Sequence, residues 1–219
     1  MPASGTMTRI ARLSPAFVLA LLTAILVAGC GVAGASPSMS PVMVEAVTQA
    51  PLGVRDTAVS PVRPAPALRL TDQDGRPFDL ASLRGAPVFV YFGYTHCPDI
   101  CPTTLADLRA AVKLAGVPAK VVFVTIDPAR DDAAAMKRYV DYYQAGYTGL
   151  TGTDAQIAEA AAAWGVSYRK LESDSASGYA MAHSTDVYLV DATGNLRHHL
   201  FFGAGADLIA RRLREVAGG

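Results

Sequence analysis

The chain of 219 residues lacks the features of several large protein classes. Only Phe17–Ala28 resembles a membrane span, and it has 12 residues, whereas a transmembrane helix needs about 20. A transporter with several spans is therefore excluded. The chain also has no internal repeat and no P-loop, so the phosphate-binding loop of P-loop nucleotide-binding proteins is not present.

An excess of basic residues is also missing, since the formal net charge of the whole chain is 0. Arg9 and Arg12 precede Cys30 and no acidic residue does, so the chain from Cys30 onward has 17 basic and 19 acidic residues and a charge of −2. Phosphate binding needs a basic face, so no nucleic-acid partner is expected.

The first 29 residues follow the order of an export signal. Arg9 and Arg12 precede the apolar run Phe17–Ala28, and small residues lead directly to Cys30. This end resembles the bacterial lipobox, in which cleavage leaves the cysteine as a lipid-modified first residue. We therefore expect residues 1–29 to be a lipoprotein signal peptide, and Cys30 to anchor an exported protein to the membrane on its extracytoplasmic side. An ordinary signal peptide, or an uncleaved anchor with a chance cysteine, is the alternative.

Residues 30–66 have the composition of a linker. They are rich in Ala, Val, Pro, Ser and Gly, carry few charges and show no sustained periodicity. Pro-rich segments are extended, at about 3.1 Å per residue in the polyproline II limit. A flexible, lipid-anchored tether is predicted here.

Strand and helix patterns alternate over residues 67–219, which predicts an α/β domain with helices flanking a central mixed sheet. Two runs rich in Val and aromatic residues, Pro87–Tyr94 and Val121–Ile126, predict central strands buried on both faces. The other expected elements are short strands near 68–70 and 77–80, helices near 102–116, 131–143, 154–164 and 206–216, and a strand hairpin over 185–190 and 196–202.

This order of elements is that of a thioredoxin-like fold. In that fold the reactive cysteines lie at the C-terminal end of the first buried strand. Cys97 occupies this position, directly after the run Pro87–Tyr94.

Cys97 and Cys101 form the pattern C-P-D-I-C. On a helical turn this spacing puts both sulfurs on one face, close enough to share a metal or to form a disulfide. A helix N-terminus favours thiolate over thiol, which improves both sulfurs as ligands and nucleophiles. Thioredoxin-type oxidoreductases use C-x-x-C instead, so the extra residue leaves room for an ion between the sulfurs. A structural disulfide is the alternative.

His183 is the third candidate residue. It comes directly before the strand expected from Thr185, in the loop that packs against the active-site cysteines of thioredoxin-like folds. Two thiolates and an imidazole suit Cu(I), and they suit Cu(II) where an oxygen ligand is added. Zinc accepts the same ligands but normally takes four.

Three separated motifs resemble the Sco/SenC family: VYFGYTHCPDICP (Val90–Pro102), DPARD (Asp127–Asp131) and HSTDVYLVD (His183–Asp191). They occur in the order and spacing of that family, and the resemblance spans essentially all of Leu68–Val216.

The resemblance implies a copper metallochaperone that helps to load the binuclear copper site of cytochrome c oxidase subunit II. It implies Cys97, Cys101 and His183 as copper ligands, and Asp127 as a residue that supports the site without binding the metal. A carboxylate at the end of the neighbouring strand could orient His183 or a copper-bound water, although helix capping or a turn before Pro128 would explain it equally well. A further copper chaperone or a thiol reductant is a candidate partner.

Two other functions use the same cysteines. A thiol–disulfide oxidoreductase that keeps the target's cysteines reduced would need Cys97 and Cys101 but not His183. A peroxidase of the peroxiredoxin type would need a single cysteine, which the paired cysteines argue against. In the carrier, a disulfide between Cys97 and Cys101 would abolish copper binding.

Overall fold

The computed structural model describes residues 55–143, 145–172 and 178–218. The predicted signal peptide, Cys30 and the tether up to residue 54 lie outside the described residues. In the part that is described, no helix has both the length and the apolar character needed to cross a bilayer.

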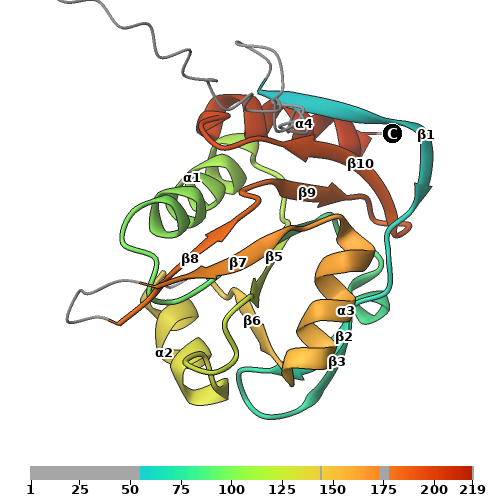
Figure 1. The fold of residues 1–219 in the computed structure, drawn as a ribbon. Helices are drawn as coiled ribbons and strands as arrows, with labels where there is room; N and C mark the ends of the chain where they lie inside the picture. Colours follow the sequence, from blue (N-terminus) through green and yellow to red (C-terminus); the bar gives the residue numbers. More distant parts are fainter. Residues whose placement is uncertain (1–54, 144, 173–177, 219) are drawn as a thin grey trace, which may run out of the picture. The chain divides into compact units, whose positions relative to one another are not determined.

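An eight-stranded mixed sheet forms the centre of the domain, with the strand order β1-β10-β9-β4-β5-β6-β2-β3 (Figure 1). Its strands are β1 (Asp56–Pro64), β2 (Arg69–Asp72), β3 (Pro77–Asp79), β4 (Val88–Gly93), β5 (Lys120–Thr125), β6 (Thr148–Thr151), β9 (Val187–Val190) and β10 (Asn195–Leu200). Strands β4, β5 and β6 run parallel, and the other pairs are antiparallel.

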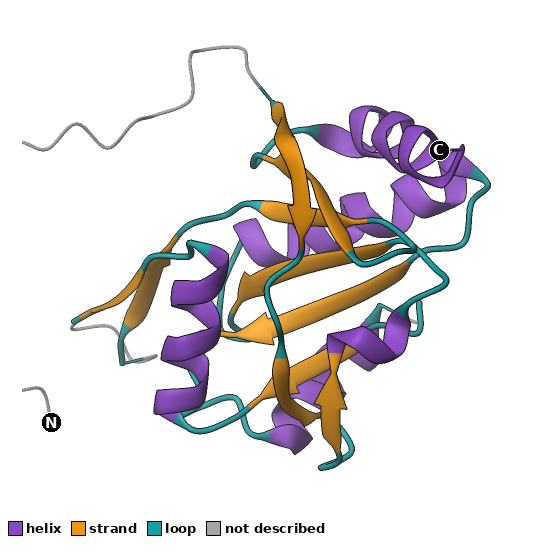
Figure 2. Cartoon of the chain, turned by 90° about the vertical axis from the view of Figure 1, so that its right-hand side faces the viewer, coloured by secondary structure: helices purple, strands orange, loops and turns teal. Residues whose placement is uncertain are grey.

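Helices cover both faces of this sheet (Figure 2). They are α1 (Ile100–Ala115), α2 (Ala133–Tyr142), α3 (Asp154–Trp164) and α4 (Gly205–Gly218), with a short 3-10 turn at Leu80–Leu83. Successive side chains of a strand point to opposite faces, and helices cover both faces here. All six residues of β4 are therefore buried. Tyr91 contacts Cys101 of α1, whereas Phe92 packs on Trp164 of α3 with ring centroids 6.1 Å apart.

Local sequence signals define the ends of several helices. The side chain of Asp132 accepts a hydrogen bond from the Ala135 amide at the start of α2, and Thr153 and Gln156 form a capping box at the start of α3. Helix α1 ends at Gly116, whose φ of 66° is left-handed, a conformation that glycine adopts without the steric cost of a Cβ atom.

A second, two-stranded sheet projects from the domain. Its strands β7 (Tyr168–Leu171) and β8 (Ala180–His183) pair antiparallel, with Tyr168 opposite His183. This hairpin connects α3 to β9, and its strands are not part of the large sheet (Figure 1). The sequence predicted His183 in a loop, which is wrong: it is the last residue of β8. Four-residue strands such as β8 are too short to leave a clear period.

The predicted tether is wrong over residues 56–64, which form strand β1 and pair with β10 at the edge of the large sheet. Pro61 and Pro64 made this segment resemble a linker. An edge strand tolerates proline because one side of its backbone has no ladder partner. The folded domain therefore begins by Asp56.

The sequence also missed β6, a short strand that contains Gly149. The thioredoxin-like α/β arrangement itself is confirmed: the two strands predicted as central, β4 and β5, lie side by side in the middle of the sheet.

Candidate metal centre

The three predicted ligands come from three elements that meet at the C-terminal end of β4. Cys97 lies in the loop after β4, Cys101 lies in the first turn of α1, and His183 ends β8. The Sγ atom of Cys101 lies 3.8 Å from Nε2 of His183, although 82 positions separate these residues in the chain. The fold therefore brings the distant imidazole to the cysteine pair.

The two sulfurs have different surroundings. The Sγ atom of Cys97 is partly exposed and accepts the backbone N–H of Cys101 at 3.4 Å, which is the interaction of a helix N-terminus with an anionic sulfur. Cys101 is fully buried. Its Sγ accepts a hydrogen bond from the hydroxyl of Tyr91 at 3.5 Å.

These surroundings move the two thiol pKa values in opposite directions. The pKa of Cys97 is lowered to about 4, chiefly by the hydrogen bond from the Cys101 side chain, with His183 and the amide of Cys101 adding to the effect. The pKa of Cys101 is raised, because it shares that hydrogen bond with the Cys97 thiolate and because it is buried. At neutral pH the pair therefore holds one proton, on Cys101.

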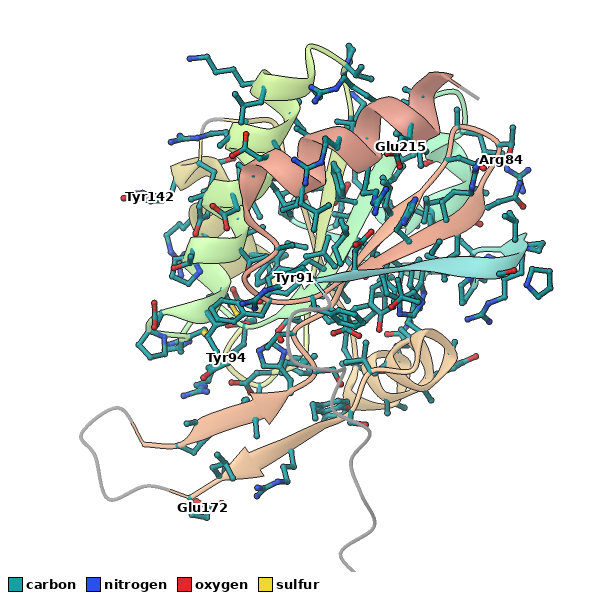
Figure 3. All side chains as sticks on the ribbon, turned by 90° about the horizontal axis from the view of Figure 1, so that it is seen from above. Arg84, Tyr91, Tyr94, Tyr142, Glu172 and Glu215 are labelled. Carbon is teal, nitrogen blue, oxygen red and sulfur yellow. The ribbon has the colours of Figure 1, made fainter. Side chains whose placement is uncertain are left out.

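His183 is oriented by its neighbours. Its Nδ1 lies 2.6 Å from the carbonyl oxygen of Ser184. A carbonyl only accepts, so Nδ1 is the donor in this contact, and Nε2 is the ring nitrogen that faces the sulfur of Cys101. The rings of Tyr91 and Tyr94 flank the imidazole, with centroids 6.5 and 6.0 Å from its own, and Figure 3 shows both tyrosines at this end of β4.

The donor set and its spacing fit a soft metal ion. Ligands held at about 2.3 Å (sulfur) and 2.0 Å (nitrogen) on one ion lie roughly 3.7 Å apart when the angle between them is near 120°. The observed separation of Cys101 Sγ and His183 Nε2 is 3.8 Å. Among the described residues no three His, Cys, Asp or Glu side chains surround a common centre, and Cys97 is the partly exposed member of the proposed ligand set.

Gly93 has no side chain, and this leaves room for the sulfur of Cys101. A Cβ atom at this last residue of β4 would lie 2.8 Å from Cys101 Sγ and 2.7 Å from Cε2 of Phe123, well inside van der Waals contact. The buried sulfur occupies this space. The sequence analysis missed this role, because nothing local to Gly93 indicates which residues pack on it.

Asp131 is a second residue that the sequence analysis did not identify as part of the site. It is fully buried and accepts hydrogen bonds from the Thr95 amide at 3.0 Å, the Thr95 hydroxyl at 2.6 Å and the Thr125 hydroxyl at 2.7 Å. Thr95 lies in the loop that carries Cys97, so Asp131 fixes this loop to the end of β5. His96, a conceivable alternative ligand, contacts Thr95 through Nδ1 at 3.0 Å.

Asp127 lies close to the site but has other partners than expected. Its carboxylate pairs with Arg130 and accepts the Tyr179 hydroxyl at 2.7 Å. The described contacts do not join it to the His183 ring, whose Nδ1 is engaged by Ser184. The suggestion that Asp127 orients His183 directly is therefore replaced by an indirect connection through Tyr179. Its support of the metal stays a prediction.

The fold and this site define a class of protein, namely a thioredoxin-like domain with two thiols and an imidazole at the end of its central strand. The chain belongs to the SCO1/SenC family, since the model of that family matches residues 61–218. The family resemblance of the three motifs is thereby confirmed.

Individual relatives agree with this assignment. A protein of Stutzerimonas stutzeri, named provisionally as copper-binding, is 37% identical over 161 residues, which are 70% of this chain and 77% of that protein. The crystal structure of Arabidopsis thaliana ScoI with copper bound is 30% identical, has a TM-score of 0.67, and the match covers 70% of this chain and 97% of that one.

A more distant structure shares the fold. BsSco, described as a member of the Sco family of cytochrome c oxidase assembly proteins, is 21% identical with a TM-score of 0.55, and the match covers 71% of this chain and 94% of that one. At this identity the likeness shows the fold alone.

Proposed function

We propose that this chain is a copper carrier, which binds the ion through Cys97, Cys101 and His183 and delivers it to cytochrome c oxidase subunit II. The observation that carries the proposal is the 3.8 Å approach of His183 Nε2 to the buried sulfur of a closely spaced cysteine pair. Membership of the SCO1/SenC family and the copper-bound relative support copper as the cargo.

The protonation of the pair favours metal capture. Thiolates rather than thiols bind metal, and the low pKa of Cys97 makes it a thiolate at neutral pH. Cys101 gives up its proton when the ion arrives, and the Tyr91 hydroxyl then donates to the new thiolate. Copper binding near pH 7 should therefore release about one proton per ion.

Release to the partner would proceed by ligand exchange. The partly exposed Cys97 is the ligand that an incoming thiolate can replace first, whereas Cys101 is buried. Oxidation of both cysteines to a disulfide would remove two of the three ligands, so the carrier would work only when reduced. A thiol reductant and a further copper chaperone are the partners that this cycle would require.

We also propose export and membrane anchoring, which rest on residues 1–54 and not on the described domain. Cleavage before Cys30 and lipidation of its sulfur would hold the domain on the extracytoplasmic side of the membrane. A tether raises the local concentration of the domain near a membrane-bound partner without new contacts. Mass spectrometry of the membrane fraction should find diacylglyceryl-modified Cys30, and an unmodified mature N-terminus elsewhere would refute the anchor.

Anaerobic copper titration of the reduced protein tests the site. The wild type should bind one Cu(I), and Cys97→Ala, Cys101→Ala and His183→Ala should each lose tight binding. His96→Ala is the matched control, because this imidazole lies next to Cys97 but contacts Thr95. Equal loss in the His96 and His183 variants would contradict the proposed ligand set.

Delivery needs a separate experiment. The copper-loaded protein should transfer metal to the reduced, metal-free soluble domain of subunit II, observed by the absorption of the binuclear copper site as it forms. A Cys97→Ser variant, incubated with the same amount of copper, should not transfer copper to the acceptor domain. Failure of the wild type with a competent acceptor would refute delivery while leaving copper binding intact.

A thiol–disulfide oxidoreductase is the second candidate, and the opposite pKa shifts of Cys97 and Cys101 favour it. A partly exposed thiolate of low pKa paired with a buried thiol is the arrangement of redox-active cysteine pairs. The His183→Ala variant separates the two functions. If it loses copper yet restores oxidase assembly fully in cells lacking the wild-type protein, the reductase is correct.

A further inference from the structure

The hairpin that carries His183 is a small sheet with few supports of its own. Within the part of the chain that the structure describes, strands β7 and β8 pair only with each other, and an isolated two-stranded hairpin is marginally stable in water. Figure 3 shows the hairpin extending away from the large sheet, with Glu172 near its far end. Whatever holds this hairpin against the domain therefore sets where His183 lies.

Three side chains form such a support, which we call the hairpin clamp: Asp127, Arg130 and Tyr179. Arg130 pairs through Nε with the Asp127 carboxylate and donates from Nη1 to the Tyr179 carbonyl at 2.9 Å. The Tyr179 hydroxyl donates to the same carboxylate at 2.7 Å. The guanidinium carbon also lies 3.7 Å from the centroid of the Tyr179 ring.

The clamp joins the two parts of the metal site. Asp127 and Arg130 belong to the segment that follows β5, which also contains Asp131, the anchor of the Cys97 loop. Tyr179 directly precedes β8, whose last residue is His183. The Arg130 guanidinium further lies 5.8 Å from the ring of Tyr94, the same ring that packs edge-on against His183.

We propose that Arg130 is a positioning residue that holds His183 beside the cysteine pair and thereby slows the release of copper. This inference rests on the proposed function. Arg130 is suited to the task because its planar group engages a carboxylate, a carbonyl and an aromatic face at once, which a lysine ammonium cannot do. Its side chain is 16% exposed and that of Asp127 is 5% exposed, so water competes little for these contacts.

The test measures copper release from the full-length, reduced, Cu(I)-loaded protein to a chromogenic Cu(I) chelator without oxygen. Arg130→Lys and Tyr179→Phe should each release copper faster, by about 10- to 100-fold, the range found when groups that orient a metal ligand are lost. Tyr179→Phe keeps the stacked ring and removes only the bond to Asp127, so it tests the clamp even if Arg130→Lys folds poorly.

Arg197→Lys is the matched control. Arg197 also pairs with a buried aspartate, Asp191, at 3.1 Å. Asp191 follows β9 at the end of the sheet where β4 begins, because Val88 pairs with Val190, and this end lies opposite the metal site. Thermal unfolding of all variants corrects for general destabilisation, and the control should keep the wild-type release rate.

A double variant separates positioning from a general structural role. If Arg130 acts through His183, Arg130→Lys should cause no further change in copper affinity when His183 is already alanine. The proposal is overturned if wild type and Arg130→Lys release copper at the same rate, or if Arg130→Lys weakens binding equally with and without His183. A wild type that binds no copper would instead refute the proposed function, and this inference with it.

Discussion

Replacing Gly93 by alanine should damage the metal site without removing any ligand. The new Cβ atom would lie 2.8 Å from Cys101 Sγ and 2.7 Å from Phe123 Cε2, whereas carbon atoms in contact are normally about 3.5–4.0 Å apart. One or both neighbours must move by roughly 0.7 Å. Phe123 has little room, since its ring packs against Tyr91 and Tyr139 with centroids 5.9 and 5.2 Å away.

The displaced sulfur should affect copper more than it affects the fold. Overpacking a core costs about 1–3 kcal/mol, and a loss of about 2 kcal/mol in a domain of this size lowers Tm by roughly 4–8 °C. Metal–ligand distances, however, are defined within about 0.2 Å. We therefore expect Gly93→Ala to fold, to unfold earlier in urea, and to bind Cu(I) at least about tenfold more weakly.

Gly149→Ala provides the matched control. A Cβ atom there would lie 3.1 Å from Val140 Cγ1 and 3.3 Å from Met136 Cβ, between β6 and α2 and away from the sulfurs. It should lower stability while leaving the copper Kd unchanged. The reasoning is refuted if Gly93→Ala loses stability but keeps the wild-type Kd and release rate, or if both variants weaken copper binding to the same degree.

Three further predictions concern the thiols and the domain boundary. The rate of Cys97 alkylation, measured by mass spectrometry, should rise with pH with a midpoint near pH 4, and a midpoint near pH 9 would contradict the structure. Because the pKa of Cys97 is lowered from 9.0 to about 4 in the folded protein, the thiolate stabilises the fold fully above pH 9. This stabilisation should decline on acidification and vanish below about pH 4. Tyr91→Phe removes the hydrogen bond to Cys101, so it should cost about 1 kcal/mol in urea unfolding and shift the pH dependence of copper binding upward, whereas an unchanged profile would show that the bond is not used. A truncated protein that begins at Leu68 lacks β1 and the Asp56 carboxylate that pairs with Arg212. Its free energy of unfolding should be lower by about 2 kcal/mol or more than that of a protein that begins at Asp56. Equal urea midpoints for the two proteins would show that β1 does not contribute to the stability of the domain.

Local sequence was sufficient for the elements with strong periodic signals. The apolar runs of β4 and β5 predicted buried strands, because short runs rich in Val and aromatic residues are typical of strands covered on both faces. Only three residues separate Cys97 from Cys101, so the two sulfurs could be expected to be neighbours wherever the helix began. The fold class and the cysteine pair could therefore be predicted without coordinates.

Weak local signals account for the elements that were missed. Strands β6 and β8 have four residues each, too few to display a period of two against their neighbours. Strand β1 contains two prolines, and only its pairing with β10 distinguishes it from a linker. The partners of β1 and β6 include strands that are distant in the chain, β10 and β2, which a local pattern does not contain.

The candidate site also has a part that the sequence predicted and a part that only the tertiary structure determined. The sequence alone supplied the chemistry: two thiols and an imidazole of the types that a soft ion prefers, and the family to which they belong. Only the tertiary structure decided how they are held, with Gly93 making room for Cys101, Asp131 anchoring the Cys97 loop, and Arg130 tying the hairpin of His183 to the end of β5. The physical reason is that side-chain identity sets which bonds are available, whereas distances between residues far apart in the chain are set by the packing of the whole domain.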